Sequence, residues 1–164
     1  MIPFNKPYMT GRELWNIAQA HANGHLSGDG MFTKKCHAWL EARTGTHKAL
    51  LTHSCTAALE MAAILANLQP GDEVITTSIT DMGALTPILY QGGIPVFADV
   101  DPKTWNVTAE TIKRCLSERT RAIIVTHLFG NPCDMAEIMQ LAQSRNIPVI
   151  EDAAQAFLAK HHGQ

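Results

Sequence analysis

The chain has 164 residues, of which 46% are hydrophobic, so it can form one ordinary domain with a real core but not two comfortable ones. Lysine and arginine number 13 against 15 aspartates and glutamates, a net charge of -2, so no basic field indicates a nucleic acid or an anionic membrane as partner. No stretch has the apolar length of a membrane span, and the amino terminus lacks the pattern of a signal peptide.

The four cysteines form no C-x-x-C pair, which favours free thiols over a metal site or a redox motif. Together with the absence of a targeting segment, this pattern predicts a cytoplasmic protein. A small molecule is therefore the partner we expect.

Two helices are predicted first, over residues 11–23 and 31–43, because apolar residues recur there at helical spacing. Thr10 is placed to cap the first helix, and Gly45 is placed to end the second. From residue 48 onward, short apolar runs alternate with helical patterns, which indicates repeated β-α units and a mainly parallel sheet. Strands are predicted over 49–52, 73–77, 95–98, 122–126 and 148–151, and helices over 56–66, 82–91, 109–118 and 135–144.

Polar side chains follow the last predicted strand. Ile147 to Ile150 have the length and branching of a strand buried on both faces, and they run directly into Glu151, Asp152 and Gln155. Ligands of an open parallel sheet bind just beyond the carboxyl ends of its strands, so Asp152 and Gln155 are candidate site residues. Capping of a short following helix is an equally good interpretation of Asp152.

The turn from His53 to Ala58 precedes a helix of strong helix formers. A helix amino terminus exposes unpaired N–H groups, so this turn could hold a phosphate, with the hydroxyls of Ser54 and Thr56 as further donors. Ordinary capping by Ser54 is the alternative. A phosphate-suited turn and an acid after a later strand together suggest a phosphorylated, nitrogen-containing cofactor.

The chain resembles the DegT/DnrJ/EryC1/StrS family of pyridoxal-phosphate-dependent sugar aminotransferases, and its first third looks most like the dTDP-4-amino-4,6-dideoxygalactose transaminases within it. The motifs that carry the resemblance are Ile2-Pro3-Phe4-Asn5, Cys55-Thr56-Ala57-Ala58-Leu59-Glu60, Gln69-Pro70-Gly71-Asp72-Glu73-Val74, Pro95-Val96-Phe97-Ala98-Asp99-Val100 and Glu151-Asp152-Ala153-Ala154-Gln155.

The resemblance implies an α/β fold, a three-layer, mainly parallel sheet, and pyridoxal phosphate as cofactor. Residues 1–164 would form a single partial domain, part of the large domain of a fold-type I enzyme, with the Schiff-base lysine and the small domain beyond Gln164. The resemblance further implies a homodimer that takes a nucleotide sugar and an amino-acid donor, expected to be glutamate.

The resemblance also implies roles for individual residues. Asp152 would pair with the pyridine nitrogen and Gln155 with the ring hydroxyl, while Thr56 and the backbone of Ala57 would hold the phosphate in the turn that includes Ser54 and Cys55. His127 falls in a motif that lines the pocket, although a histidine after a strand is more often a structural hydrogen-bonding group.

Asp81 departs from the family pattern, since many relatives carry an aromatic ring there that stacks on the cofactor. We expect Asp81 to face the cofactor or substrate, or else to cap the helix that begins at Met82.

The sequence is compatible with two other functions. One is a dehydratase of the same family, in which another residue replaces the lysine. The other is a non-catalytic, truncated product that binds phosphate-bearing ligands weakly or associates with a full-length partner. The sequence beyond Gln164 discriminates between them, and a chain that ends at Gln164 is expected to be inactive by itself.

Overall fold

The computed structural model describes residues 1–3 and 5–163. The chain divides into two compact units, Met1–Leu51 and Thr52–Gln164. Among the described residues, no helix has both the length and the apolar character needed to cross a membrane. All four cysteines are free thiols, as the spacing predicts.

The first unit contains two helices, α1 (Glu13–Ala22) and α2 (Met31–Thr44), and none of the residues in either helix is buried. Helix α2 ends at Gly45, whose left-handed backbone (φ 71°) confirms the predicted stop. The predicted cap of α1 is wrong, because Arg12 is its N-cap residue. The N–H and hydroxyl of Thr10 instead donate to the Glu13 carboxylate, at 2.6 and 2.8 Å.

The strand predicted over residues 49–52 is absent. The N–H of Ala49 donates to Oε1 of Glu41 at 3.1 Å, and the N–H of Leu51 donates to Nε2 of His37 at 2.9 Å. Side chains of α2 therefore satisfy backbone donors that a strand would offer to a neighbouring strand. An apolar run of four residues has the length of a strand, but it becomes one only where a partner strand lies beside it.

The second unit is built on a parallel sheet in the order β2-β1-β3-β4. Its strands are β1 (Glu73–Thr77), β2 (Ile94–Ala98), β3 (Thr120–Thr126) and β4 (Val149–Asp152). Between them lie α4 (Met82–Tyr90), α5 (Ala109–Cys115), the short 3-10 helix η1 (Leu128–Gly130) and α6 (Met135–Ser144), while α3 (Cys55–Leu65) precedes β1. Apart from 49–52, the predicted strands and helices are confirmed, with shifts only at their ends.

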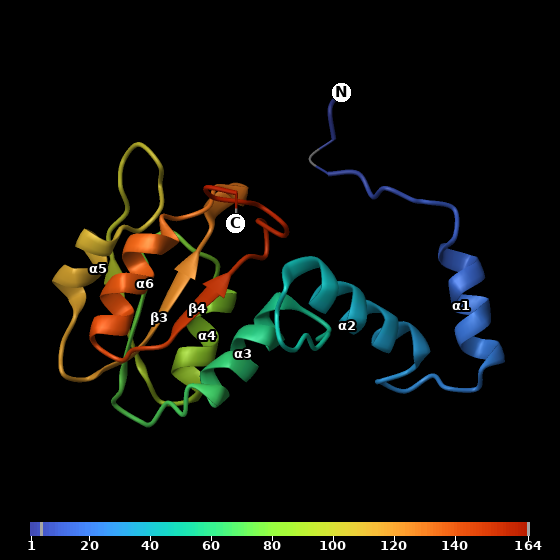
Figure 1. Cartoon of the computed structure of the whole chain (residues 1–164), viewed down its shortest axis with the longest axis horizontal. Coiled ribbons are helices and arrows are strands. Elements are labelled where there is room, and N and C mark those ends of the chain that lie inside the picture. The colour runs from blue at the N-terminus through green and yellow to red at the C-terminus, as the bar shows by residue number, and fades with distance from the viewer. Residues whose placement is uncertain (4, 164) are drawn as a thin grey trace. The chain divides into compact units, whose positions relative to one another are not determined.

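The sheet separates two hydrophobic cores, because successive side chains of a strand point to opposite faces. On β3, Ala122 and Ile124 pack toward α3 and α4, whereas Ile123 and Val125 pack toward α5 and α6. Figure 1 shows these helix pairs on opposite sides of the strands. The three-layer α/β fold is therefore confirmed, and its parallel strands bring their carboxyl ends to one edge of the sheet.

Candidate functional site

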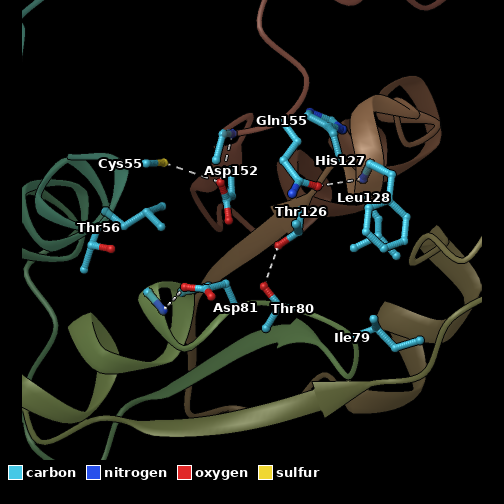
Figure 2. A pocket seen from close by; sticks show the side chains of 15 residues that line it. Cys55, Thr56, Ile79, Thr80, Asp81, Thr126, His127, Leu128, Asp152 and Gln155 are labelled. Carbon is cyan, nitrogen blue, oxygen red and sulfur yellow. Dashed lines mark hydrogen bonds between the residues drawn. The ribbon is translucent and has the colours of Figure 1, made fainter. Parts of the chain in front are cut away.

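A pocket of about 400 Å³ lies at the carboxyl ends of β1, β3 and β4, beside the amino terminus of α3 (Figure 2). This volume falls in the range of small-molecule sites, roughly 300 to 1,000 Å³. Six of the predicted site residues line it: Cys55, Thr56, Asp81, His127, Asp152 and Gln155. Ser54 and Ala57 do not.

Asp152 is the buried last residue of β4. Its Oδ1 accepts two hydrogen bonds, from the N–H of Ala154 at 3.1 Å and from the thiol of Cys55 at 3.5 Å (Figure 2). Within the described part of the chain, no donor is bonded to its Oδ2. Turns rather than a helix follow Asp152, so the interpretation of this residue as a helix cap is wrong. The carboxylate is thus held through one oxygen and keeps the other for a ligand.

Burial and the Asp152 charge raise the pKa of the Cys55 thiol, with burial the larger cause. The thiol therefore keeps its proton and can act as the donor in this pair.

Gln155 has a defined amide orientation. Its Oε1 accepts the N–H of Phe129 at 3.1 Å, and because a backbone N–H only donates, the amide oxygen must lie on that side. The Nε2 group finds no acceptor among residues 1–3 and 5–163. Gly130 (φ 85°) allows the close approach of these segments, since a Cβ there would lie 3.0 Å from the Gln155 carbonyl oxygen. Gln155 therefore offers two N–H donors.

The phosphate-suited turn is capped as the alternative interpretation predicted. The hydroxyl oxygen of Ser54 accepts the N–H of Ala57 at 3.1 Å, so these two groups satisfy each other. The hydroxyl of Thr56 has no partner among the described residues, and it lies close to Gly83, where a Cβ would be only 2.6 Å from its oxygen. Thr56 therefore lines the pocket, whereas Ser54 and the Ala57 N–H form the hydrogen bond that caps α3.

Asp81 is the N-cap residue of α4, and its Oδ1 accepts the N–H of Gly83 at 2.7 Å. The capping interpretation is confirmed, although the residue also lines the pocket. One carboxylate oxygen of Asp81 therefore stabilises the start of α4. The side chain occupies the position at which the resemblance leads us to expect an aromatic ring.

His127 is buried and bonded through both ring nitrogens. Its Nδ1 accepts the N–H of Cys133 at 3.1 Å, so the proton is on Nε2, which donates to Oε2 of Glu151 at 2.9 Å. This hydrogen bond lowers the pKa of Glu151 more than burial raises it. His127 is therefore a structural hydrogen-bonding group that also forms part of the pocket wall.

The sequence interpretation missed a pair of hydroxyls and an aromatic ring. Thr80 and Thr126 lie 3.0 Å apart, oxygen to oxygen, and point toward each other across the pocket floor (Figure 2). Phe129 lies at the pocket edge and is exposed. Thr126 ends β3 and Thr80 closely follows β1, so the strand-end argument applied to Asp152 could have found this pair.

The profile of the DegT/DnrJ/EryC1/StrS aminotransferase family matches residues 7–164. The chain is 34% identical over 163 residues to the GDP-perosamine synthase of Escherichia coli O157:H7, a match that covers 99% of the chain and 45% of that protein. It also matches the X-ray structure of an aminotransferase from Psychrobacter cryohalolentis, with a TM-score of 0.88, 33% identity, and coverage of 94% of this chain and 40% of that one.

A third match is the crystal structure of ntda from Bacillus subtilis with bound cofactor PMP, with a TM-score of 0.84 and 27% identity. It covers 89% of this chain and 33% of that one. The chain thus spans less than half the length of the proteins it matches here. By the extent of the profile match and the shared fold, the chain belongs to the DegT/DnrJ/EryC1/StrS aminotransferase family.

Proposed function

We propose that this chain supplies the cofactor pocket of a pyridoxal-phosphate-dependent aminotransferase. In this proposal, the whole protein transfers an amino group, with glutamate as donor, to the keto carbon of a nucleotide-linked deoxysugar of the dTDP-4-keto-6-deoxyhexose type. The observation that carries the proposal is the pocket itself, which is lined by buried Asp152, partly buried Thr56 and exposed Gln155. Each of these side chains keeps a polar group free of partners among the described residues.

The free groups suit pyridoxal phosphate. The carboxylate Oδ2 of Asp152 is an acceptor for a protonated ring nitrogen, and Nε2 of Gln155 is a donor for the ring oxygen. The hydroxyl of Thr56 lies in the first turn of α3, where the partial positive charge of a helix amino terminus favours a phosphate. An acid, an amide and a hydroxyl at the edge of one pocket thus match the three polar parts of the cofactor.

When bound, the cofactor supplies an electron sink for amino-group transfer. Asp152 would hold the proton of the ring nitrogen, and its own position is set by Cys55 and the Ala154 N–H. Gln155 would orient the ring, because its amide is tied to Phe129. The Schiff-base lysine is expected in the part of the protein beyond residue 164.

The proposal extends to a cytoplasmic homodimer. Support for the sugar substrate comes from the family match and from the GDP-perosamine synthase relative. The identities of the sugar, the nucleotide and the amino donor are separate parts of the proposal. Each can be tested by an activity assay with alternative substrates.

The test is pyridoxal phosphate binding by the whole protein, followed by absorbance, in wild type and Asp152→Asn. The substitution removes a charge-assisted bond of about 1.5 to 3 kcal/mol, so the cofactor Kd should rise roughly 10- to 150-fold. Asp134→Asn is the matched control, since Asp134 is an exposed aspartate whose side chain makes no cap bond at the start of α6. A pyridoxal phosphate affinity and a transamination rate equal to wild type in Asp152→Asn would contradict the proposal.

A further inference from the structure

Two exposed aromatic residues of the second unit have left-handed backbones. Trp105 has φ 63° and is 55% exposed, and Phe129 has φ 53° and is 79% exposed. Bulky side chains rarely adopt positive φ, and they do so where the surrounding structure enforces it. Both features lower folding stability, because a positive φ is unfavourable for a bulky residue and because the exposed rings remain in contact with water.

The turn that carries Trp105 is closed by Asp101. Its Oδ1 accepts the N–H groups of Lys103 and Thr104, each at 2.9 Å, and its carbonyl oxygen accepts the N–H of Trp105 at 2.8 Å. The N–H of Asp101 in turn donates to the carbonyl of Asn106 at 2.9 Å. The backbone of Trp105 is therefore fixed from both sides.

The turn that carries Phe129 is tied to this first turn by two asparagines. Asn106 is buried, and its amide donates to the Asn131 carbonyl at 2.9 Å while its oxygen accepts the Leu128 N–H at 3.3 Å. The amide of Asn131 donates to the Thr104 carbonyl at 3.2 Å. The two aromatic residues are thus mounted on one connected framework.

Between the two turns lies a groove of about 240 Å³, lined by Thr104, Trp105, Leu128, Phe129 and Asn131. Leu128 and Phe129 also line the 400 Å³ pocket, so the groove lies directly beside it. The hydrogen bond from the Phe129 N–H to Oε1 of Gln155 holds the shared wall in place. Because Phe129 is exposed at the edge of both spaces, a ligand held in the pocket can pass over its ring to reach the groove.

We propose that this groove binds the base of the nucleotide-linked substrate, stacked against Trp105 and Phe129. The proposal rests on the proposed function for the class of its ligand, since a sugar nucleotide is a polar chain that ends in a planar ring. Aromatic side chains stack on bases of any identity. The Oδ1 of Asn131 has no partner among the described residues and is an acceptor for a ring N–H of guanine or thymine.

The experiment measures the Kd of GDP and of dTDP by calorimetry on the whole protein, with and without pyridoxal phosphate, and uses inorganic pyrophosphate as the probe without a base. Trp105→Ala and Phe129→Ala should each weaken nucleotide binding by roughly 5- to 150-fold, the range of one lost base stack. Pyrophosphate affinity should stay unchanged. Trp105→Phe keeps a ring and should recover most of the loss, which separates stacking from misfolding.

Trp15→Ala is the matched control, because Trp15 is a similarly exposed tryptophan, at 61%, outside the groove. Unchanged nucleotide affinity in both alanine variants would overturn the proposal, as would an equal loss of pyrophosphate binding. A changed sedimentation coefficient with unchanged nucleotide Kd would assign the groove to a second copy of the chain instead. Failure of the proposed function is distinguishable, because it appears as absent cofactor binding while ring-dependent nucleotide binding persists.

Discussion

The two ends of the sheet differ in whether their polar side chains are paired with other residues of the chain. At the amino ends of the strands, the buried carboxylate of Glu73 receives hydrogen bonds from Arg119 and Ser117, and Asp72 pairs with Arg121 at 3.3 Å. At the carboxyl ends, Asp152 and the neighbouring pocket residues keep polar atoms without partners in the described part of the chain. One end is closed by its own side chains, and the other remains open to a ligand.

This difference predicts that one end of the sheet contributes mainly to folding stability and the other mainly to ligand binding. A buried charge is costly unless it is paired, so the closed end should dominate the free energy of unfolding. The open end should dominate ligand affinity, because its groups gain partners only when a ligand enters. Substitutions at each end therefore test the comparison.

The largest expected effect is at the closed end. Arg119→Ala leaves the buried Glu73 carboxylate with Ser117 alone, and we expect a loss of about 2 to 3 kcal/mol in the free energy of unfolding, below the roughly 3 to 5 of fully buried pairs. Denaturant unfolding measures it, and cofactor affinity should not change.

Arg114→Ala is its matched control. The two arginine side chains are similarly exposed, at 65% and 70%, but the carboxylate partner is 9% exposed for Arg119 and 74% for Arg114. Exposed pairs contribute about 0 to 1 kcal/mol. Equal losses in the two variants would mean that burial of Glu73 does not matter at this end.

At the open end, Gly83→Ala should cost about 1 to 3 kcal/mol by overpacking. The added Cβ would lie 2.6 Å from the Thr56 hydroxyl oxygen and 3.0 Å from Oδ1 of Asp81, so Thr56 must move and cofactor affinity should fall as well. Unfolding and cofactor titrations measure the two effects. Gly28→Ala, with nothing within 4 Å, should change neither, and equal behaviour of the two variants would refute the close contact.

A smaller effect concerns pH. The hydrogen bond from His127 lowers the pKa of Glu151 below 4.5, so its contribution to stability is complete above pH 4.5 and is lost as the pH falls through the lowered folded value. Wild type should therefore exceed Glu151→Gln in unfolding free energy at neutral pH, and the difference should shrink in acid. A difference that grows as the pH falls would contradict the assigned sign.

The smallest effect is expected for Asp81→Ser, because serine also caps helices, and stability should change by less than about 0.5 kcal/mol. Loss of cofactor or substrate affinity at unchanged stability would show that Asp81 contributes to binding. Unchanged affinity would leave capping of α4 as its role. Calorimetry and thermal unfolding of the same samples give both readouts.

The strand predictions succeeded where a neighbouring strand pairs with the apolar run. The strand predicted over 122–126 lies within β3, which is largely buried, whereas the stretch Ile147 to Ile150, expected to be buried on both faces, contributes only Val149 and Ile150 to β4 and both are partly exposed. Residues 49–52 showed a similar pattern but form no strand, and side chains of α2 accept the N–H groups of Ala49 and Leu51 instead. Only spatial neighbours distinguish these two cases.

The site residues also divide into features that are local in the sequence and features that depend on tertiary contacts. Asp152, Gln155 and Thr56 could be predicted as pocket residues because strand ends and helix starts are local features. Ser54 was predicted as a phosphate donor with capping as the alternative, and it caps α3. The single free oxygen of Asp152 could not, because it depends on Cys55, which is 97 residues away along the chain.

The sequence by itself determined the alternation of helices and strands from residue 56 onward and the strand end where an acid would meet a ligand. These follow from local periodicity and from capping, which depend on residues a few positions apart. The tertiary structure alone decided the tautomer of His127, the orientation of the Gln155 amide, and the groove between Trp105 and Phe129. The Gln155 amide and the groove depend on hydrogen bonds between residues 22 to 27 positions apart, which meet only when the sheet assembles. The tautomer of His127 depends on the turn that brings the Cys133 N–H back to its ring, six residues along the chain.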